Sequence, residues 1–310
     1  MQRGSSNLLG ILILIGLVTL VGFSPKSPSV GSGTSGTRWS LAPGFSVSDS
    51  TSDSYRETTN SSSLISIGTG NASYTYQPYE EYITIENRGR NPINITGWQL
   101  RNGKDERTYN YGGNLQRFSA DISLIPQGHL YISAREARLP QDIVLGAYER
   151  AIVTTGSMGA QTPYKITSFK ENICSGYLEA LPDYSFTPPL SQNCPRPYEE
   201  KGLEGLERDC RDFIRTLSNC ETPKFESKTP DKKGYCETCI DGKILSSQCA
   251  TFIKEHFSYQ GCLANHGGDE DFSSNTWRIF LGRGWEMWDK DYESIELYNR
   301  AGELVNFMNY

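Results

Sequence analysis

The chain has 310 residues, 36% of them hydrophobic, which is enough for about two domains with buried cores. Thirty Lys and Arg stand against 36 Asp and Glu, a net charge of −6, so the broad basic surface typical of nucleic-acid binders is missing. The motifs HExxH, GxSxG, GxxxxGK and GxGxxG are also absent. We therefore expect no nucleic-acid partner, and an enzyme is the less favoured class.

The N-terminal 63 residues predict a membrane anchor followed by a tether. From Leu8 to Phe23 the sequence carries no charge, and a helix of this length would measure about 24 Å at ~1.5 Å per residue. Arg3 ahead of it favours a cytoplasmic N-terminus at 1–7. No small-residue cleavage site follows, which favours an uncleaved transmembrane signal-anchor at 8–23 over a cleaved signal peptide. Residues 24–63, rich in Ser, Thr, Gly and Pro, predict a disordered linker. The expected protein is single-pass, with its folded part extracytoplasmic.

From Leu64 onward, short runs of alternating apolar residues predict β-strands separated by Gly, Pro and Asn. The predicted strands lie at 82–85, 98–100, 129–132, 142–145, 278–281, 294–298 and 303–307. The last two form a hairpin with a four-residue turn at 299–302. Many short strands without long helices between them favour a mainly β, antiparallel β-sandwich. Its two pieces, 64–160 and 275–310, must share one sheet system, because neither alone has enough strands.

Residues 161–274 differ in character and predict a cysteine-rich helical insertion. Helical apolar periodicity occurs at 203–217 and at 249–257, and both segments contain the string Cys-x-x-Phe-Ile. All eight cysteines of the chain lie in this insertion: Cys174, Cys194, Cys210, Cys220, Cys236, Cys239, Cys249 and Cys262.

The cysteines allow two chemical interpretations. Their even number, their clustering and the expected extracytoplasmic location favour disulfides, with about 105 possible connectivities. The alternative is a zinc site, because thiolate and imidazole are preferred zinc ligands and a Cys-x-x-Cys turn can supply two of them. Its candidate ligands are Cys236 and Cys239 with Cys249, Cys262, His256 or His266. We expect disulfides, with no metal and no cofactor.

Other candidate residues are fewer. Trp285 and Trp288 follow a predicted strand in the string GRGWEMW and are the candidate binding residues for a carbohydrate or a peptide, unless they pack against the insertion. The acidic run at 266–271 lacks the alternation of a calcium loop and is interpreted as a solvated loop. No carboxylate pair stands out for acid–base chemistry, so no catalytic residue is nominated.

The strand pattern resembles the lamin-tail domain. The matching motifs are EYITIEN at 81–87, GWQL at 97–100, PQG at 126–128, and a final hairpin with SIEL at 294–297 and GELV at 302–305. The resemblance implies an immunoglobulin-like sandwich that serves as a binding or scaffolding module on bacterial surface proteins. The expected function is therefore a non-enzymatic, membrane-anchored module for a protein or envelope polymer. The alternative is a surface enzyme or zinc-binding module with its site in the insertion.

The insertion also resembles the helical hairpins that paired Cys-x9-Cys motifs lock into antiparallel helices. Cys210 and Cys220 have that spacing, whereas Cys249 and Cys262 are three residues further apart. This resemblance implies the pairs Cys210–Cys262, Cys220–Cys249, Cys236–Cys239 and Cys174–Cys194.

Overall fold

The computed structural model describes residues 64–310 except 105–107, 118, 134–138, 159–162 and 291–292. All of the described residues belong to one compact unit, Tyr55–Tyr310. The predicted N-terminus at 1–7, anchor at 8–23 and linker at 24–63 lie outside the described residues and stay predictions. Within the described part of the chain, no helix has both the length and the apolar character needed to cross a membrane.

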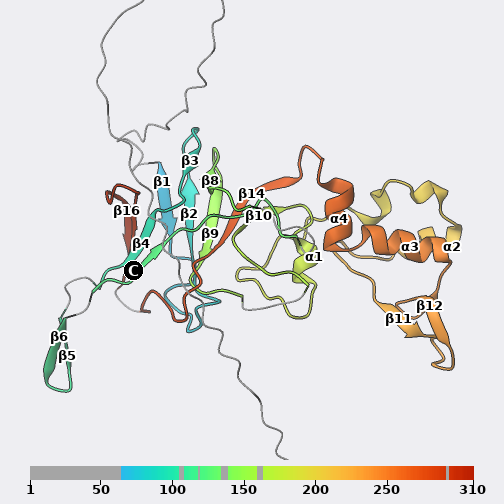
Figure 1. Ribbon diagram of the computed structural model, residues 1–310, viewed down its shortest axis with the longest axis horizontal. Helices are drawn as coiled ribbons and strands as arrows, with labels where there is room; N and C mark the ends of the chain where they lie inside the picture. The colour runs from blue at the N-terminus through green and yellow to red at the C-terminus, as the bar shows by residue number, and fades with distance from the viewer. Residues whose placement is uncertain (1–63, 105–107, 118, 134–138, 159–162, 291–292) are drawn as a thin grey trace, which may run out of the picture. The chain divides into compact units, whose positions relative to one another are not determined.

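The largest sheet among the described residues has five strands in the order β1-β2-β9-β14-β10 (Figure 1). Their bounds are Ile65–Gly68 for β1, Tyr82–Asn87 for β2, Arg150–Thr154 for β9, Ser273–Phe280 for β14 and Phe169–Asn172 for β10. β14 is parallel to β9, with Arg278 opposite Ile152, and antiparallel to β10. Alternation in β2 buries Ile83 and Ile85, as its period-two apolar pattern requires.

A second sheet has four described strands in the order β16-β15-β4-β7. Their bounds are Leu304–Asn309 for β16, Ser294–Tyr298 for β15, Gln99–Asn102 for β4 and Ile122–Leu124 for β7. The predicted C-terminal hairpin is confirmed, since β15 and β16 pair antiparallel across the turn that contains Gly302. Leu100 of β4 lies opposite Leu297 of β15, and both side chains are fully buried.

One hydrophobic core lies between these two sheets. It combines Ile83 and Val153 of the first sheet with Leu100 and Leu297 of the second, and Trp98 fills it at 1% exposure. Strands from both ends of the described chain pair in each of these sheets, since β14 pairs with β9 in the first and β15 pairs with β4 in the second.

Smaller sheets complete the β structure. β3 (Ile93–Asn94) pairs with β8 (Val144–Leu145), and β5 (Thr108–Tyr111) pairs with β6 (Asn114–Arg117) in a hairpin. Within the insertion, β11 (Phe225–Lys228), β12 (Tyr235–Ile240) and β13 (Lys243–Ile244) form a separate sheet. The predicted strand at 129–132 is wrong: this segment makes a single isolated bridge, between His129 and Phe169.

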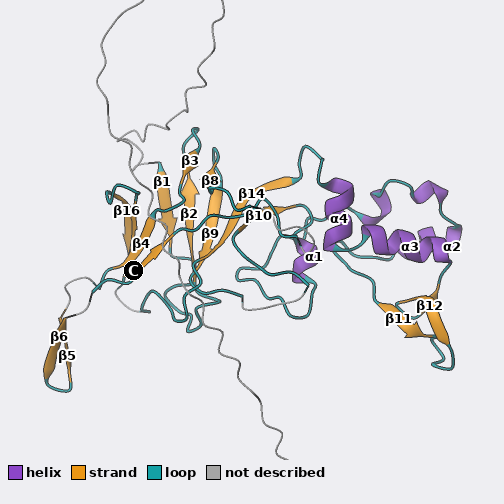
Figure 2. Cartoon of the chain, in the orientation of Figure 1, coloured by secondary structure: helices purple, strands orange, loops and turns teal. Residues whose placement is uncertain are grey.

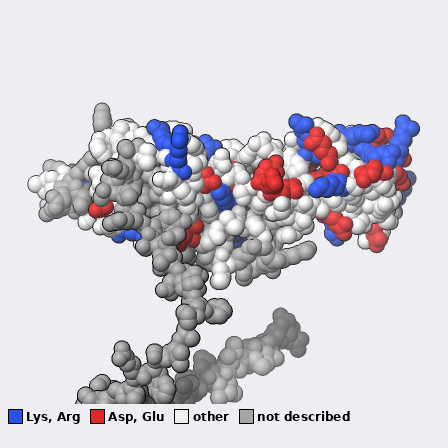
Figure 3. Space-filling view, turned by 90° about the horizontal axis from the view of Figure 1, so that it is seen from above, with Lys and Arg blue, Asp and Glu red and all other residues white. Residues whose placement is uncertain are grey.

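Helices occur in the insertion (Figure 2). The α-helices are α1 (Gly176–Glu179), α2 (Arg208–Ile214), α3 (Ser247–His256) and α4 (Tyr259–His266), with 3-10 turns at Pro197–Glu199 and Leu203–Gly205. On the face shown in Figure 3, charged side chains gather over the end that holds α2 and α3. Asp212 of α2, for example, pairs with Arg208 and Arg215 at 3.5 and 3.0 Å. Such exposed pairs add solubility rather than much stability.

A buried ion pair attaches the insertion to the largest sheet. Arg278 of β14 and Glu171 of β10 are 3% and 5% exposed, and their side chains are hydrogen-bonded to each other. The guanidinium also donates to the carbonyl oxygens of Pro188 at 2.6 Å and Pro189 at 3.0 Å. Because a buried charge is tolerated only when it is paired and hydrogen-bonded, this network fixes residues 188–189 against the sheet.

The predicted fold class, an immunoglobulin-like antiparallel sandwich behind a transmembrane helix, is wrong. The described chain is mainly β, but it is divided into several small sheets with four helices, none of which is a candidate membrane span. The pairing of β9 with β14 is parallel, and β10 of the predicted insertion belongs to the same sheet. A parallel pair needs a long crossover connection, and the insertion supplies that connection between β9 and β14.

The cysteines are all oxidised, as predicted, but most of the implied pairings are wrong. The four disulfides are Cys174–Cys262, Cys194–Cys220, Cys210–Cys249 and Cys236–Cys239. Cys236–Cys239 is therefore confirmed. The implied pairs that the structure replaces are Cys210–Cys262, Cys220–Cys249 and Cys174–Cys194.

The helices explain why the twin Cys-x9-Cys arrangement does not form. α2 ends at Ile214, and Cys220 lies beyond it in a left-handed conformation, with φ 61°. The segment from Cys249 to Cys262, which the hairpin resemblance treats as one helix, is divided in two, because Ser258 caps a new helix by accepting the N–H of Gly261 at 3.0 Å. Cys249 and Cys262 consequently lie on different helices, α3 and α4.

Candidate functional site

Two loops carry a group of exposed aromatic side chains. The β1–β2 loop covers residues 69–81, and the described part of the β14–β15 loop covers 281–290 and 293. Tyr74, Tyr76 and Trp285 are 66%, 70% and 62% exposed, and Tyr79 is 48% exposed. Single exposed apolar residues are ordinary, but several large aromatic side chains on adjoining loops are typical of an interaction site. We call Tyr74, Tyr76, Tyr79 and Trp285 the aromatic loop surface.

Glu81 anchors the β14–β15 loop. Its side chain is completely buried, and its carboxylate accepts the backbone N–H of Met287 at 2.7 Å and of Trp288 at 3.2 Å. Burial raises the pKa of Glu81, and the two backbone hydrogen bonds oppose that rise only in part. Asn102 of β4 donates to the carbonyl of Met287 at 3.0 Å, which fixes the same turn from the other sheet.

The β1–β2 loop is held by its own side chains. The amide of Asn71 donates to the carbonyl of Glu80 and accepts the N–H of Tyr82, both at 2.8 Å. The N–H of Gly156, after β9, donates to the carbonyl of Pro78 at 2.6 Å. The loop that presents the three tyrosines is therefore tied at both ends, so ordering it on binding costs little entropy.

Trp285 is positioned by an arginine. The guanidinium of Arg283 lies 5.3 Å from the centre of the Trp285 ring, within cation–π range. Arg283 is itself fixed by Asp121, at 2.7 Å between Nη2 and Oδ1. The exposed indole of Trp285 therefore contacts a guanidinium, that of Arg283, which the ion pair with Asp121 holds in place.

A pocket of about 480 Å³ lies where the two loops meet. It combines aromatic rings with charges of both signs, since its walls are Thr75, Tyr76, Glu286, Trp288, Asp289 and Lys290. The ammonium of Lys290 lies over the ring of Tyr76, and Asp289 pairs with Lys104 at 2.8 Å. Such a mixture of rings and polar groups is typical of small-ligand pockets.

The two predicted binding residues are placed very differently. Trp285 is displayed on the surface, whereas Trp288 is 3% exposed and packs in the main core, with one side forming part of the pocket wall. Sequence reasoning missed the tyrosines of the β1–β2 loop and the anchor Glu81. The crowding of tyrosines around Pro78, in the string YTYQPYEEY, was the signal that could have found them.

The alternative zinc or enzyme site predicted in the insertion has no free thiolate. Every cysteine is in a disulfide, so none is free as a zinc ligand or a nucleophile. His256 stacks on Phe252 at 3.8 Å between ring centres, and its Nδ1 bonds the Phe252 carbonyl at 2.9 Å. In the described part of the chain, no cluster of three or more His, Cys, Asp or Glu could hold a metal ion.

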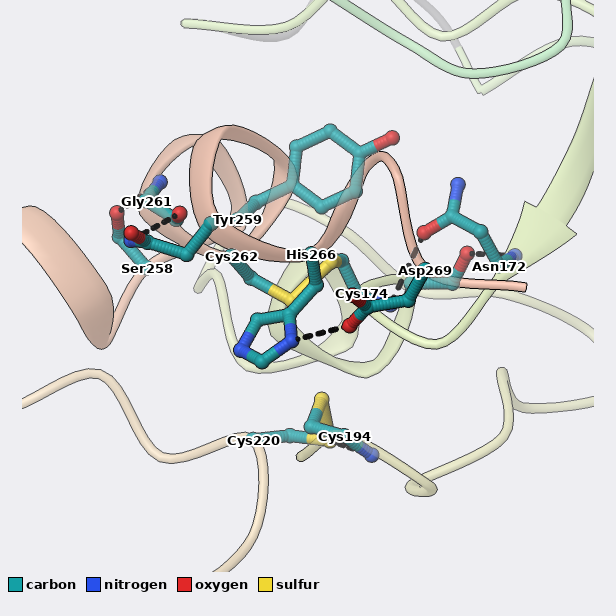
Figure 4. The surroundings of a disulfide bond; sticks show 12 residues. Asn172, Cys174, Cys194, Cys220, Ser258, Tyr259, Gly261, Cys262, His266 and Asp269 are labelled. Atoms are coloured by element: carbon teal, nitrogen blue, oxygen red, sulfur yellow. Dashed lines mark hydrogen bonds and ion pairs between the residues drawn. A yellow bond between two sulfur atoms is a disulfide. The ribbon is translucent and has the colours of Figure 1, made fainter. Parts of the chain in front are cut away.

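His266 belongs to a structural cluster beside two disulfides (Figure 4). Its Nδ1 lies 2.7 Å from Asp269 Oδ2, and its Nε2 lies 3.0 Å from Glu200 Oε1. Burial alone would lower the pKa of His266, but hydrogen bonds and charges from Asp269 and Glu200 outweigh it and raise that pKa. Both ring nitrogens are occupied, so His266 joins α4 to the 3-10 turn at Pro197–Glu199. Glu270 and Asp271, of the same acidic run, are exposed.

No family model, curated protein or solved structure matches the chain. The function must therefore be argued from the residues themselves. The lamin-tail motifs at 81–87 and 97–100 lie on or next to β2 and β4, and those at 294–297 and 302–305 lie in the β15–β16 hairpin. Membership of that family stays a prediction.

Proposed function

We propose that this chain is a non-enzymatic binding or scaffolding module that works at the cell surface, and that it contacts a protein or an envelope polymer through the aromatic loop surface. The supporting observation is that Tyr74, Tyr76, Tyr79 and Trp285 are exposed on two loops, which hydrogen bonds to Asn71 and Glu81 hold in place. Rigid aromatic side chains provide large contact area at a small entropic cost, which makes them frequent binding anchors.

The proposed location outside the cytoplasm is supported by the four disulfides. Such bonds persist in oxidising compartments and are rare where cellular thiols are kept reduced. Attachment to a membrane through residues 8–23 is a separate prediction, which lies outside the described residues. The binding proposal does not depend on it.

The test measures binding of the full chain to cell-envelope polymer stripped of lipid, and to the surface-protein fraction, from the cells that express it. Removing the lipid excludes retention through 8–23. The decisive variant replaces Tyr74, Tyr76, Tyr79 and Trp285 with Ser. We expect its affinity for one of the two fractions to fall by at least about tenfold, because hot-spot aromatic residues dominate such contacts.

A matched control replaces four exposed apolar residues elsewhere, Leu115, Leu124, Leu304 and Phe307, with Ser. The control should bind like the unchanged chain. Equal binding by the aromatic variant and the unchanged chain, or loss of binding only in the control, would refute the proposal.

A further inference from the structure

The disulfide Cys236–Cys239 differs from the other three in what it joins. Its two cysteines lie three residues apart on a single strand, β12. The other disulfides join segments that are separated by 26, 39 and 88 residues. Opening Cys236–Cys239 therefore disconnects no two elements of the fold.

Cys236–Cys239 also differs in its surroundings. The six other cysteines pack in two buried hydrophobic clusters, which contain Cys174, Cys194, Cys220 and Cys262 in one case and Cys210 and Cys249 in the other. Cys236 and Cys239 belong to none of the three hydrophobic clusters of the described residues. An attacking thiol must reach the sulfur, so a disulfide inside a cluster exchanges only after that cluster opens.

Cys236 is the more accessible member of its pair. It is 9% exposed, the largest value among the eight cysteines, whereas Cys239 is fully buried. Cys236 also lies in a bulge, because Tyr235 pairs with Lys228 and Cys239 pairs with Glu226, which leaves residues 236–238 of β12 opposite residue 227 alone. A bulged residue is outside the regular ladder, so Cys236 can move without breaking the pairs on either side.

The small sheet that carries this disulfide is thinly covered. All four residues of β11 are exposed, and Tyr235, next to Cys236, is 76% exposed. A segment with few buried contacts opens locally at a lower cost in free energy than a core does. A thiol in solution therefore reaches Cys236 more easily than it reaches the cysteines in the clusters.

We propose that Cys236–Cys239 is a thiol–disulfide exchange site, at which a dithiol reductant attacks Cys236 while the other three disulfides stay closed. The first thiolate forms a bond to the sulfur of Cys236, and the Cys236–Cys239 bond breaks. Cys239 leaves as a thiolate and takes up a proton. This activity goes beyond the proposed binding function and does not involve the aromatic loop surface.

The second thiolate of the reductant completes the exchange. It attacks the reductant sulfur of the mixed disulfide and releases Cys236, which also takes up a proton. The reductant loses two electrons and becomes a cyclic disulfide. The cysteine pair gains the two electrons and two protons, so the step balances.

The first test measures which disulfide opens first. The full chain, folded and oxidised, is treated with dithiothreitol at neutral pH without denaturant for increasing times, alkylated with iodoacetamide and mapped by mass spectrometry. We expect Cys236 and Cys239 to be labelled at least about tenfold faster than Cys194 and Cys220, because access limits exchange. Cys194 and Cys220 are 3% and 1% exposed and are the control pair within the same chain. The circular dichroism spectrum should stay that of the oxidised chain.

The second test determines which sulfur is attacked. Cys239→Ser leaves Cys236 as a free thiol, and Cys236→Ser leaves Cys239. The two variants lack the same disulfide, so each is the matched control of the other. The aromatic disulfide reagent dithiobis(nitrobenzoate) should react at least about tenfold faster with Cys236 than with the buried Cys239.

Three outcomes overturn the proposal. The first is that any other disulfide is labelled as fast as Cys236–Cys239 or faster. The second is that labelling accompanies loss of the circular dichroism spectrum, since the thiols would then be exposed by global unfolding. The third is that the two single variants react with the reagent at equal rates, or that Cys239 reacts faster. None of these outcomes bears on binding through the aromatic loop surface.

Discussion

The four disulfides close loops of very different lengths, so their removal should destabilise the chain by graded amounts. The separations are 88 residues for Cys174–Cys262, 39 for Cys210–Cys249, 26 for Cys194–Cys220 and 3 for Cys236–Cys239. Restriction of the unfolded chain gives contributions of about 4.6, 3.9, 3.5 and 1.6 kcal/mol in that order. Replacing each pair with Ala should therefore lower the free energy of unfolding along this series.

The decisive comparison is between the longest and the shortest loop. The Cys174→Ala, Cys262→Ala variant should lose about 3 kcal/mol more than the Cys236→Ala, Cys239→Ala variant. The measurement is urea unfolding of the oxidised proteins at neutral pH, followed by circular dichroism. If the variant without Cys174–Cys262 is already unfolded at 25 °C, the variant without Cys236–Cys239 must still show the circular dichroism spectrum of the unchanged chain. Equal losses in the two variants, or a larger loss for Cys236–Cys239, would refute the loop-length reasoning.

Three further predictions concern packing and charge. Gly176→Ala places a Cβ 2.3 Å from Cys220 Sγ and should cost about 1–3 kcal/mol by urea unfolding, whereas Gly205→Ala meets no atom within 4 Å and should stay within about 0.5 kcal/mol. Arg278→Met leaves the buried carboxylate of Glu171 without its ion-pair partner and should lower the free energy of unfolding by about 3–5 kcal/mol. Adding Glu171→Gln to this variant removes the unpaired charge and should restore part of that loss. If the losses of the two single variants simply add in the double variant, the prediction is wrong. The pKa of His266 is higher in the folded chain than in the unfolded chain, where it is near 6.5. The contribution of His266 to the free energy of unfolding is therefore fully present below the unfolded pKa and is lost as the pH rises through the folded pKa. The stability advantage over His266→Gln should therefore be larger at about pH 5.5 than at about pH 8.5, and a constant or rising difference would contradict the assignment.

Local pattern was sufficient for several elements of this fold. β2 and the β15–β16 hairpin follow from alternating apolar residues, because a half-buried strand must place its apolar side chains on one face. The oxidised state of the cysteines follows from their number and clustering. These features depend on residues close together in sequence or on composition, so one sequence is enough to predict them.

Features that depend on distant contacts were not predictable in this way. The parallel pairing of β9 with β14 joins segments on either side of the insertion, and no local pattern specifies it. The pairing of Cys174 with Cys262 depends on where α4 begins, which a single capping residue, Ser258, determines. The burial of Trp288 depends on Glu81, some two hundred residues earlier, which captures its backbone N–H. The local sequence around Trp288 is compatible with an exposed indole, because the residues that bury the ring and the carboxylate of Glu81 lie far away in the sequence.

The position of β14 between β9 and β10 has a consequence for biosynthesis. β1, β2 and β9 are translated first, but β9 meets its partner only after the chain from Thr154 to Ser273 has been made. At about 5–20 residues per second, that interval lasts roughly 6–24 s. During it, β9 has an open edge, and its residues from Ala151 to Thr154, buried in the finished protein, are uncovered. This edge of β9 therefore stays open to pairing with other chains until β14, which begins only at Ser273 of the 310 residues, has been made.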